Sequence, residues 1–191
     1  MRFFFFGTLM DRDVLDVVVE RAPLVGGVGG PAVHARQPAW LDGYRRVTVQ
    51  RETFPMVVAA PGQRMEGVVV EGLNATDIDR ILFFESIEYA PSTIDVSLAD
   101  GSPLSAQCFL TNEGIGHKGD VWEYERWLSD HKADCLRETR LWMALYGHVD
   151  CHEADSLWDA ALAAGRPLED MIAEVRAQSR DDRSRLAKSS A

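Results

Sequence analysis

Four consecutive phenylalanines stand at positions 3–6, close to the N-terminus, and are followed directly by Gly7. Successive side chains of a strand point to opposite faces, so this run places aromatic rings on both. A strand of that kind must be covered on each side, and residues 2–6 therefore predict a short strand in the centre of a sheet. The following Gly7-Thr8-Leu9 predicts a tight turn, which either serves packing alone or presents backbone N–H groups to an oxyanion.

The next part of the chain favours several strands in succession. Four segments of strand character are expected at 32–41, 44–52, 55–60 and 64–73, separated by turn signals at Asp42-Gly43, Phe54-Pro55 and Pro61-Gly62. Two further strands are expected at 91–101 and 104–112, around an Asp100-Gly101 turn. Short links between strands favour an antiparallel or mixed sheet that curls into a small barrel.

Helical patterns flank this block. Acidic residues and spaced valines predict a helix from Asp11 that Pro23 ends, and residues 25–30 (VGGVGG) read as a loop rather than a phosphate-binding turn. Residues 74–89 take helical period, with Thr76 and Asp79 resembling a capping box. From Gly119 onwards, Trp, Leu, Glu and Arg recur at helical spacing.

The predicted fold class is α+β: a small mixed or antiparallel β-barrel with flanking helices and a C-terminal helical extension. Residues 1–116 form the predicted barrel domain, 117–180 the helical extension and 181–191 a polar, disordered tail.

The charge balance excludes some partners. A formal net charge of −10 argues against nucleic acid and anionic membrane surfaces, which need a basic face. No apolar run approaches the roughly 18 residues of a membrane span. Three cysteines at irregular spacing suggest no disulfide framework, so a reducing cytoplasm is the expected location.

Glu85 is the acidic residue with the most unusual setting. It follows an apolar run and shares a predicted helix stripe with Ile78, Ile81 and Leu82. A carboxylate there is either paired for structural reasons or kept available for proton transfer, and its position alone leaves both readings open.

Six segments, in this order, resemble the gamma-glutamylcyclotransferase-like (AIG2-like) family: FFFFGTLMD, LDGYRR, FPMVVAAPG, MEGVVVEGL, IDRILFFESIEY and AQCFLTN. The resemblance covers about residues 2–112. It implies a small barrel with a cavity at one end, and an enzyme that releases 5-oxoproline from a γ-glutamyl amine or amino acid without metal or cofactor.

The resemblance also implies roles for particular residues. Glu85 matches the acid/base, Tyr89 matches a tyrosine just beyond it, and the substrate-binding turn consists of Phe6, Gly7, Thr8 and Leu9. The substrate's own α-amine closes the ring, so the protein supplies a proton shuttle and hydrogen-bond donors rather than a nucleophile. Phe6 and Phe109 depart from the family, whose members usually or often have tyrosine there, which makes the expected pocket more apolar.

Other interpretations stay open at this stage. His148, Cys151 and His152 lie close together in sequence but match no common zinc spacing, so a helix–helix junction is favoured over a metal site. The tryptophans of the C-terminal region, Trp122, Trp127, Trp142 and Trp158, are predicted to be helical core residues rather than ligand stackers. A non-catalytic binding or interaction protein of the same fold is the alternative function. The expected partner is a small γ-glutamyl molecule, and a homodimer is left open.

Overall fold

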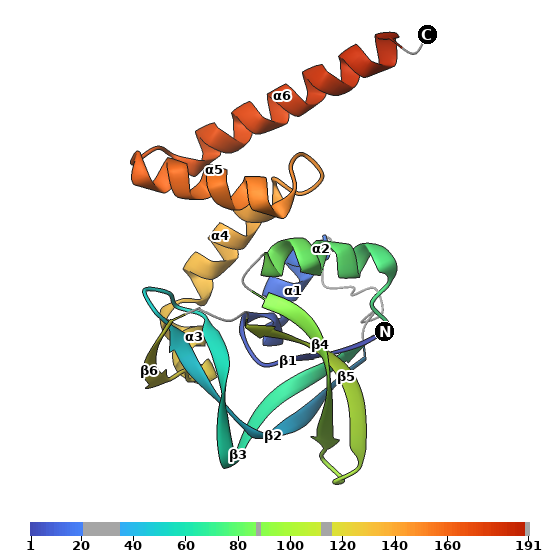
Figure 1. The fold of residues 1–191 in the computed structure, drawn as a ribbon, viewed down its shortest axis with the longest axis vertical. Helices are drawn as coiled ribbons and strands as arrows, with labels where there is room; N and C mark the ends of the chain where they lie inside the picture. The colour runs from blue at the N-terminus through green and yellow to red at the C-terminus, as the bar shows by residue number, and fades with distance from the viewer. Residues whose placement is uncertain (21–34, 87–88, 112–115, 190–191) are drawn as a thin grey trace, which may run out of the picture.

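The computed structural model describes residues 1–20, 35–86, 89–111 and 116–189 of the 191-residue chain. Its strands are β1 (Arg2–Phe5), β2 (Ala35–Val49), β3 (Pro55–Glu71), β4 (Tyr89–Leu98), β5 (Pro103–Thr111) and β6 (His117–Val121). Its helices are the 3₁₀ turn η1 (Thr8–Met10), α1 (Arg12–Val18), α2 (Ala75–Glu85), α3 (Tyr124–Asp130), α4 (Lys132–Met143), α5 (Cys151–Ala163) and α6 (Leu168–Ser189). Figure 1 shows the strands gathered at one end of the molecule, α5 and α6 at the other, and α4 running between them.

The described strands form a closed, mixed barrel. Their order is β3-β1-β5-β4-β2, and β2 pairs back onto β3 to complete the ring, while β6 adds to the outer edge of β2. The β1–β5 pair is parallel, and the other strand pairs are antiparallel. The predicted fold class, an α+β barrel with flanking helices, is confirmed.

The phenylalanine strand lies in the centre of the sheet, as its apolar run predicts. β1 pairs with β3 on one side and with β5 on the other. Phe4 and Phe6 belong to the core cluster inside the barrel, whereas Phe3 and Phe5 belong to the cluster beneath the helices. The alternation of side chains along a strand therefore divides one apolar run between two cores.

Two of the predicted strand breaks are wrong. The chain continues through Asp42-Gly43 within β2 and through Pro61-Gly62 within β3, where the register between the two strands shifts. Gly43 and Gly62 both have positive φ, 80° and 81°, a conformation that glycine adopts without steric cost. These two signals mark an irregularity in two long paired strands, whereas the Phe54-Pro55 and Asp100-Gly101 signals mark chain reversals.

The two helices next to the barrel begin with side-chain caps. Asp11 accepts hydrogen bonds from the N–H groups of Asp13 and Val14 at the start of α1. The capping box of α2 pairs Asn74 with Asp77, not Thr76 with Asp79, because the helix begins two residues earlier than the predicted cap. Pro23 and the glycine-rich loop at 25–30 lie outside the described residues.

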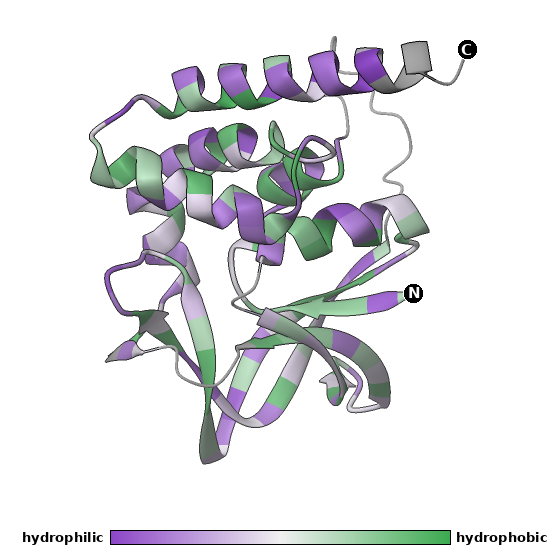
Figure 2. Cartoon of the chain, turned by 45° about the horizontal axis from the view of Figure 1, so that its top comes forward, coloured by the Kyte–Doolittle hydropathy of each residue, from purple (hydrophilic) through white to green (hydrophobic). Residues whose placement is uncertain are grey.

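The C-terminal part differs from the prediction at both ends. Residues 117–121 form β6, a strand of the barrel edge, and the helices begin only at Tyr124. At the other end α6 continues to Ser189, past residue 181, where the sequence predicted a tail. Figure 2 shows that hydrophilic residues dominate α6, while Met171 and Ile172 are buried.

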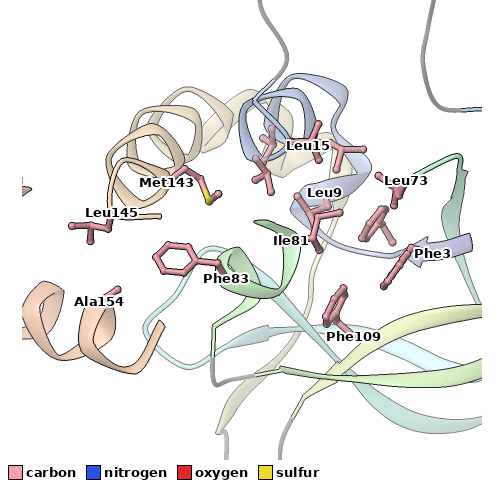
Figure 3. Close-up of a cluster of buried hydrophobic side chains, with 14 of the residues drawn as sticks. Phe3, Leu9, Leu15, Leu73, Ile81, Phe83, Phe109, Met143, Leu145 and Ala154 are labelled. Atoms are coloured by element: carbon pink, nitrogen blue, oxygen red, sulfur yellow. The ribbon is translucent and has the colours of Figure 1, made fainter. Parts of the chain in front are cut away.

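The helices and the barrel share one apolar core. Phe83, near the end of α2, lies among Met143, Leu145 and Ala154 of the C-terminal part, as Figure 3 shows. The same cluster includes Phe3 and Phe109 of the barrel strands. None of the described helices has the length and apolarity required to cross a membrane.

Candidate active site

A cavity of about 300 Å³ lies where one end of the barrel meets the helices. Its walls come from the end of β1 and the turn after it, the β2–β3 loop, the end of α2, and helices α4 and α5. The aromatic wall residues include Phe4, Phe5, Phe6, Phe54, Phe84, Tyr89, Phe109, Trp142 and Trp158.

The residues to which the resemblance assigns roles all line this cavity. They are Glu85, Tyr89 and the four residues of the N-terminal turn, Phe6, Gly7, Thr8 and Leu9. The turn and Glu85 come from elements far apart in sequence, and the barrel brings them to one end. Both phenylalanines that stand in place of family tyrosines, Phe6 and Phe109, line it as well.

The N-terminal turn is held by its carbonyl groups. The Met10 and Asp11 N–H groups donate to the carbonyls of Gly7 (2.9 Å) and Thr8 (3.0 Å), which closes η1. Behind the turn, Arg46 Nη1 donates to the Phe6 carbonyl at 3.1 Å, and its guanidinium lies over the Trp122 ring. Met10 donates the first backbone hydrogen bond within this turn. The N–H groups of Gly7, Thr8 and Leu9 come before it and have no acceptor inside the turn, as at any helix start, so they can donate to a ligand.

Arg46 is a residue that the sequence reasoning did not single out. Its guanidinium also approaches Met10 Sδ at 3.3 Å, so it contacts both ends of the turn. Burial lowers the pKa of Arg46, and the charge of Glu66 opposes that shift. An arginine keeps its charge at neutral pH even so, and this guanidinium supports the turn from the side of its carbonyls.

Glu85 is the last residue of α2 and is half-buried. The chain turns sharply after it, because Ser86 adopts a positive φ of 52°. Burial raises the pKa of the Cys108 thiol inside the barrel, and the charge of Glu85 adds to that rise.

The predicted stripe around Glu85 holds for Ile81, which is fully buried, but not for Leu82. Leu82 is 41% exposed, because it points away from the barrel face of α2. Phe83 instead is buried on the side of the C-terminal helices, and its carbonyl accepts a hydrogen bond from Trp142 Nε1 at 3.2 Å.

Tyr89 begins β4, just beyond the described end of α2. Its hydroxyl donates to the Pro55 carbonyl at 3.0 Å, across to the start of β3. Pro55 in turn lies against Gly7, where an added methyl group would come within 3.1 Å of the Pro55 ring. Tyr89, Pro55 and Gly7 therefore fix this side of the cavity together.

The C-terminal helices supply a wall that the sequence did not predict. Glu138 and Trp142 of α4, and Asp155 and Trp158 of α5, line the cavity. Trp142 and Trp158 meet edge to face with centroids 5.4 Å apart. Trp142 and Trp158 therefore line the cavity as well as pack in the core, so their predicted core role was incomplete. Trp122 and Trp127 are buried as predicted, but Trp122 lies between β6 and α3 rather than in a helix.

Asp155 is tied to the residue that follows Glu85. The Ser86 hydroxyl donates a hydrogen bond to the Asp155 carboxylate. Burial raises the pKa of Asp155, and the bond from Ser86 works against that rise. Asp155 lies four residues after Cys151 and three residues before Trp158, so these side chains lie near one face of α5. Only the packing of α5 shows which part of the protein that face contacts.

The cavity offers little support for a cysteine thiol acting as a nucleophile. Cys135 lines the cavity, but burial raises its pKa to about 11, so the thiol stays protonated at neutral pH. His148, Cys151 and His152 lie at the junction between α4 and α5, as favoured from the sequence. Within the described part of the chain, no three His, Cys, Asp or Glu side chains are grouped closely enough to hold a metal ion.

Comparison with known proteins agrees with the fold and the motif order. The model of the family described as gamma-glutamyl cyclotransferase, AIG2-like, matches residues 3–129. AIG2-like protein D from Arabidopsis thaliana is 24% identical over 143 residues, which cover 72% of this chain and 85% of that protein. AIG2-like protein C from the same plant is 23% identical over 139 residues, which cover 72% and 74%.

Two solution structures of Arabidopsis thaliana proteins share the fold. One superimposes with a TM-score of 0.51 and 21% identity, covering 72% of this chain and 86% of the other. The second has a TM-score of 0.52 and 18% identity, covering 73% and 79%. The family match ends at residue 129, so the cavity wall from α4 and α5 lies beyond the matched segment.

Proposed function

The chain belongs to the gamma-glutamyl cyclotransferase, AIG2-like family, and we propose that it is an enzyme that releases 5-oxoproline from a γ-glutamyl amine or amino acid. The observation that carries the proposal is a single cavity lined by Glu85, by the turn at Gly7 and by Tyr89. The carboxylate and the backbone turn are the two groups that this reaction requires of a protein.

The reaction is an intramolecular acyl transfer. The α-amine of the glutamyl group attacks its own γ-carbonyl, the new C–N bond closes a five-membered ring, and the amide bond to the leaving amine breaks. Ring closure within one bound molecule contributes much of the rate through proximity. Glu85 accepts the proton that the attacking amine loses and passes it to the leaving amine.

The N-terminal turn suits the charge that develops on the attacked carbonyl. Each backbone N–H group directed at an oxyanion in an enclosed site stabilises it by about 3 kcal/mol. Glycine at position 7 lets the turn pack against Pro55, since an added side chain would press on the proline ring. Arg46 supports the turn from behind without occupying the cavity.

The test is an assay of 5-oxoproline release over a panel of γ-glutamyl amines and amino acids. Glu85→Gln is expected to reduce turnover by about 10²- to 10⁴-fold, the range for loss of a general acid/base. Asp95→Asn is the control, because Asp95 is an exposed carboxylate on β4 outside the cavity wall. Full activity of a correctly folded Glu85→Gln variant would contradict the proposal.

A non-catalytic binding protein is the second candidate, and the apolar character of Phe6 and Phe109 in the cavity wall favours it. The same panel separates the two: a binding protein shows saturable binding of γ-glutamyl compounds by calorimetry and releases no 5-oxoproline. We place the protein in a reducing cytoplasm, in keeping with its three free cysteines.

A further inference from the structure

The end of α2 is held by the C-terminal helices, and Glu85 is the last residue of α2. We infer that the hydrogen bond from Ser86 to Asp155 positions the Glu85 carboxylate, which gives the C-terminal helices a part in the reaction. The inference rests on the proposed function for the proton transfer by Glu85. It assigns Ser86 and Asp155 as positioning residues, because they act through Glu85 rather than on the substrate.

Ser86 has a backbone conformation that is unusual for a residue with a side chain. Its φ is 52° and its ψ is −152°, close to a region of φ/ψ space that glycine occupies almost alone. A residue other than glycine stays in such a conformation only where the surrounding structure fixes it. Because Ser86 directly follows Glu85, whatever fixes Ser86 also fixes the last turn of α2, which carries the Glu85 side chain.

The hydrogen bond to Asp155 supplies this constraint. The Ser86 hydroxyl donates to the Asp155 carboxylate, and both residues are half-buried. A hydrogen bond to a charged acceptor is stronger than one between neutral groups. Asp155 is itself well fixed, because Ala154, its neighbour in α5, is fully buried in the core cluster that contains Phe83. The packing of α5 against the core is thus transmitted to the residue after Glu85.

A second contact holds the same turn of α2, two residues before Glu85. The Phe83 carbonyl is one of the last four of the helix, which have no donor within it. Trp142 Nε1 of α4 donates to this carbonyl at 3.2 Å, and the two rings pack with centroids 5.6 Å apart. Trp142 and Asp155 both lie beyond residue 129, where the family match ends. The segment that carries Glu85 is therefore held from both sides by this chain's C-terminal helices.

Ser86→Gly and Asp155→Ala test the inference from the two ends of the hydrogen bond. Glycine adopts a positive φ without steric cost, so Ser86→Gly keeps the turn and removes only the hydroxymethyl group. We expect each variant to lower kcat for the best γ-glutamyl substrate by about 10- to 100-fold, since displacing a catalytic group by about 1 Å has an effect of this size. KM should stay within about 2-fold of the natural value, because Arg46 holds the N-terminal turn separately. An unchanged kcat in both variants would overturn the inference.

Three further variants separate positioning from a general loss of stability. Asp155→Asn keeps an acceptor for the Ser86 hydroxyl and should recover most of kcat. A double variant with Ser86→Gly and Asp155→Ala should be no slower than either single variant, because both remove the same bond. Glu153→Ala, at an exposed position of α5 outside the cavity wall, is the control and should keep the natural kcat. If Asp155→Asn is as slow as Asp155→Ala, or if the two single effects multiply, this bond does not position Glu85.

Crystal structures of the variants distinguish failure of this inference from failure of the proposed function. In Asp155→Ala the Glu85 carboxylate should move by about 1 Å or more, or occupy two conformers, whereas in Glu153→Ala it should stay in place. If the natural protein cyclises no γ-glutamyl compound but Glu85 moves in this way, the proposed reaction fails and the positioning stands. If Glu85 keeps its place in correctly folded Ser86→Gly and Asp155→Ala variants, the positioning fails whatever the turnover.

Discussion

At the scale of single residues, Arg46 connects the sequence to the candidate site in a way that no motif indicates. It stands in the LDGYRR segment of β2, where the family resemblance was noted without a role for it. Its guanidinium reaches the carbonyl of Phe6 from the strand behind and stacks on Trp122. The turn that we propose to bind the substrate thus follows β1, whereas the arginine that holds it comes from β2.

Arg46→Met should loosen the turn and weaken substrate binding. We expect KM for the best γ-glutamyl substrate to rise several-fold with a smaller change in kcat, since the variant removes support for a binding element rather than a proton carrier. The free energy of unfolding should fall by about 1–3 kcal/mol, because the buried Phe6 carbonyl loses its donor. Arg46→Lys, which keeps one donor, should recover part of the KM. Loss of stability with an unchanged KM would show a purely structural role.

Asp155 gives a residue-scale prediction for pH. Burial raises its pKa in the folded protein, so the folded state binds the proton more tightly than the unfolded chain. The free energy of unfolding that Asp155 contributes is therefore highest below its ordinary pKa of about 4 and is lost as the pH rises through the raised value. Asp155→Asn, which can still accept the Ser86 hydrogen bond, should gain in Tm relative to the natural protein between pH 4 and 7. A pH-independent difference in Tm, measured by thermal melting, would refute this assignment.

The sequence was sufficient to single out some residues of the cavity wall and not others. The Gly7 turn and Glu85 stand out because each breaks a local pattern, a glycine after four phenylalanines and an acid after an apolar run. Asp155 breaks no pattern, since acids are frequent in its helix. Its importance comes from the packing of α5 against Ser86, which depends on contacts between residues far apart in the chain.

At the scale of elements, β1 and β3 approach each other closely where Gly67 lies. A methyl group added at Gly67 would come within 2.6 Å of the Phe5 carbonyl oxygen and would also strike the Phe4 ring. The backbone oxygen cannot move without disturbing the β1–β3 ladder. The glycine is therefore part of how the phenylalanine strand fits into the barrel.

Gly67→Ala should lower the free energy of unfolding by about 1–3 kcal/mol, the usual cost of overfilling a packed interior. Urea denaturation measures the change. Ala59→Ser, an exposed substitution on the same strand, serves as the control and should leave the urea midpoint unchanged. A Gly67→Ala variant of natural stability would show that the barrel can relax at this point.

Local sequence patterns predicted those helices and strands that adjacent residues are sufficient to determine. The apolar run of β1, the start of a helix near Asp11 and the strands around Gly101 are all readable from adjacent residues. The continuation of β2 and β3 past their glycines is not, because pairing between the two strands carries the chain through positions that resemble turns. β6 was missed for the same reason: its short polar sequence becomes a strand only through its pairing with β2.

At the scale of the whole molecule, the barrel and the C-terminal helices are joined by their apolar core. Leu145, between α4 and α5, is fully buried in the cluster that also holds Phe3 and Phe109 of the barrel. Lys132 of α4 adds ion pairs to Asp11 and Asp13 at the start of α1. The boundary predicted near residue 116 thus lies within a shared core rather than between separate ones.

We expect a single cooperative unfolding transition for the chain. Far-UV circular dichroism and tryptophan fluorescence should give coincident curves. Leu145→Ala should shift both curves together and lower the free energy of unfolding by about 2–5 kcal/mol through the cavity that it leaves. Two separated transitions, with only one affected by the substitution, would instead support independent units on either side of residue 116.

The parallel pairing of β1 with β5 has a consequence for the order of events during synthesis. β1 leaves the ribosome before β5, and its partner around Gln107 follows roughly 100 residues later, which makes this a contact of long sequence separation. Until then the nascent chain carries four adjacent phenylalanine rings with no closed barrel to receive them. Such a segment is a natural binding site for a chaperone, and a ribosome stalled before residue 103 would leave it exposed.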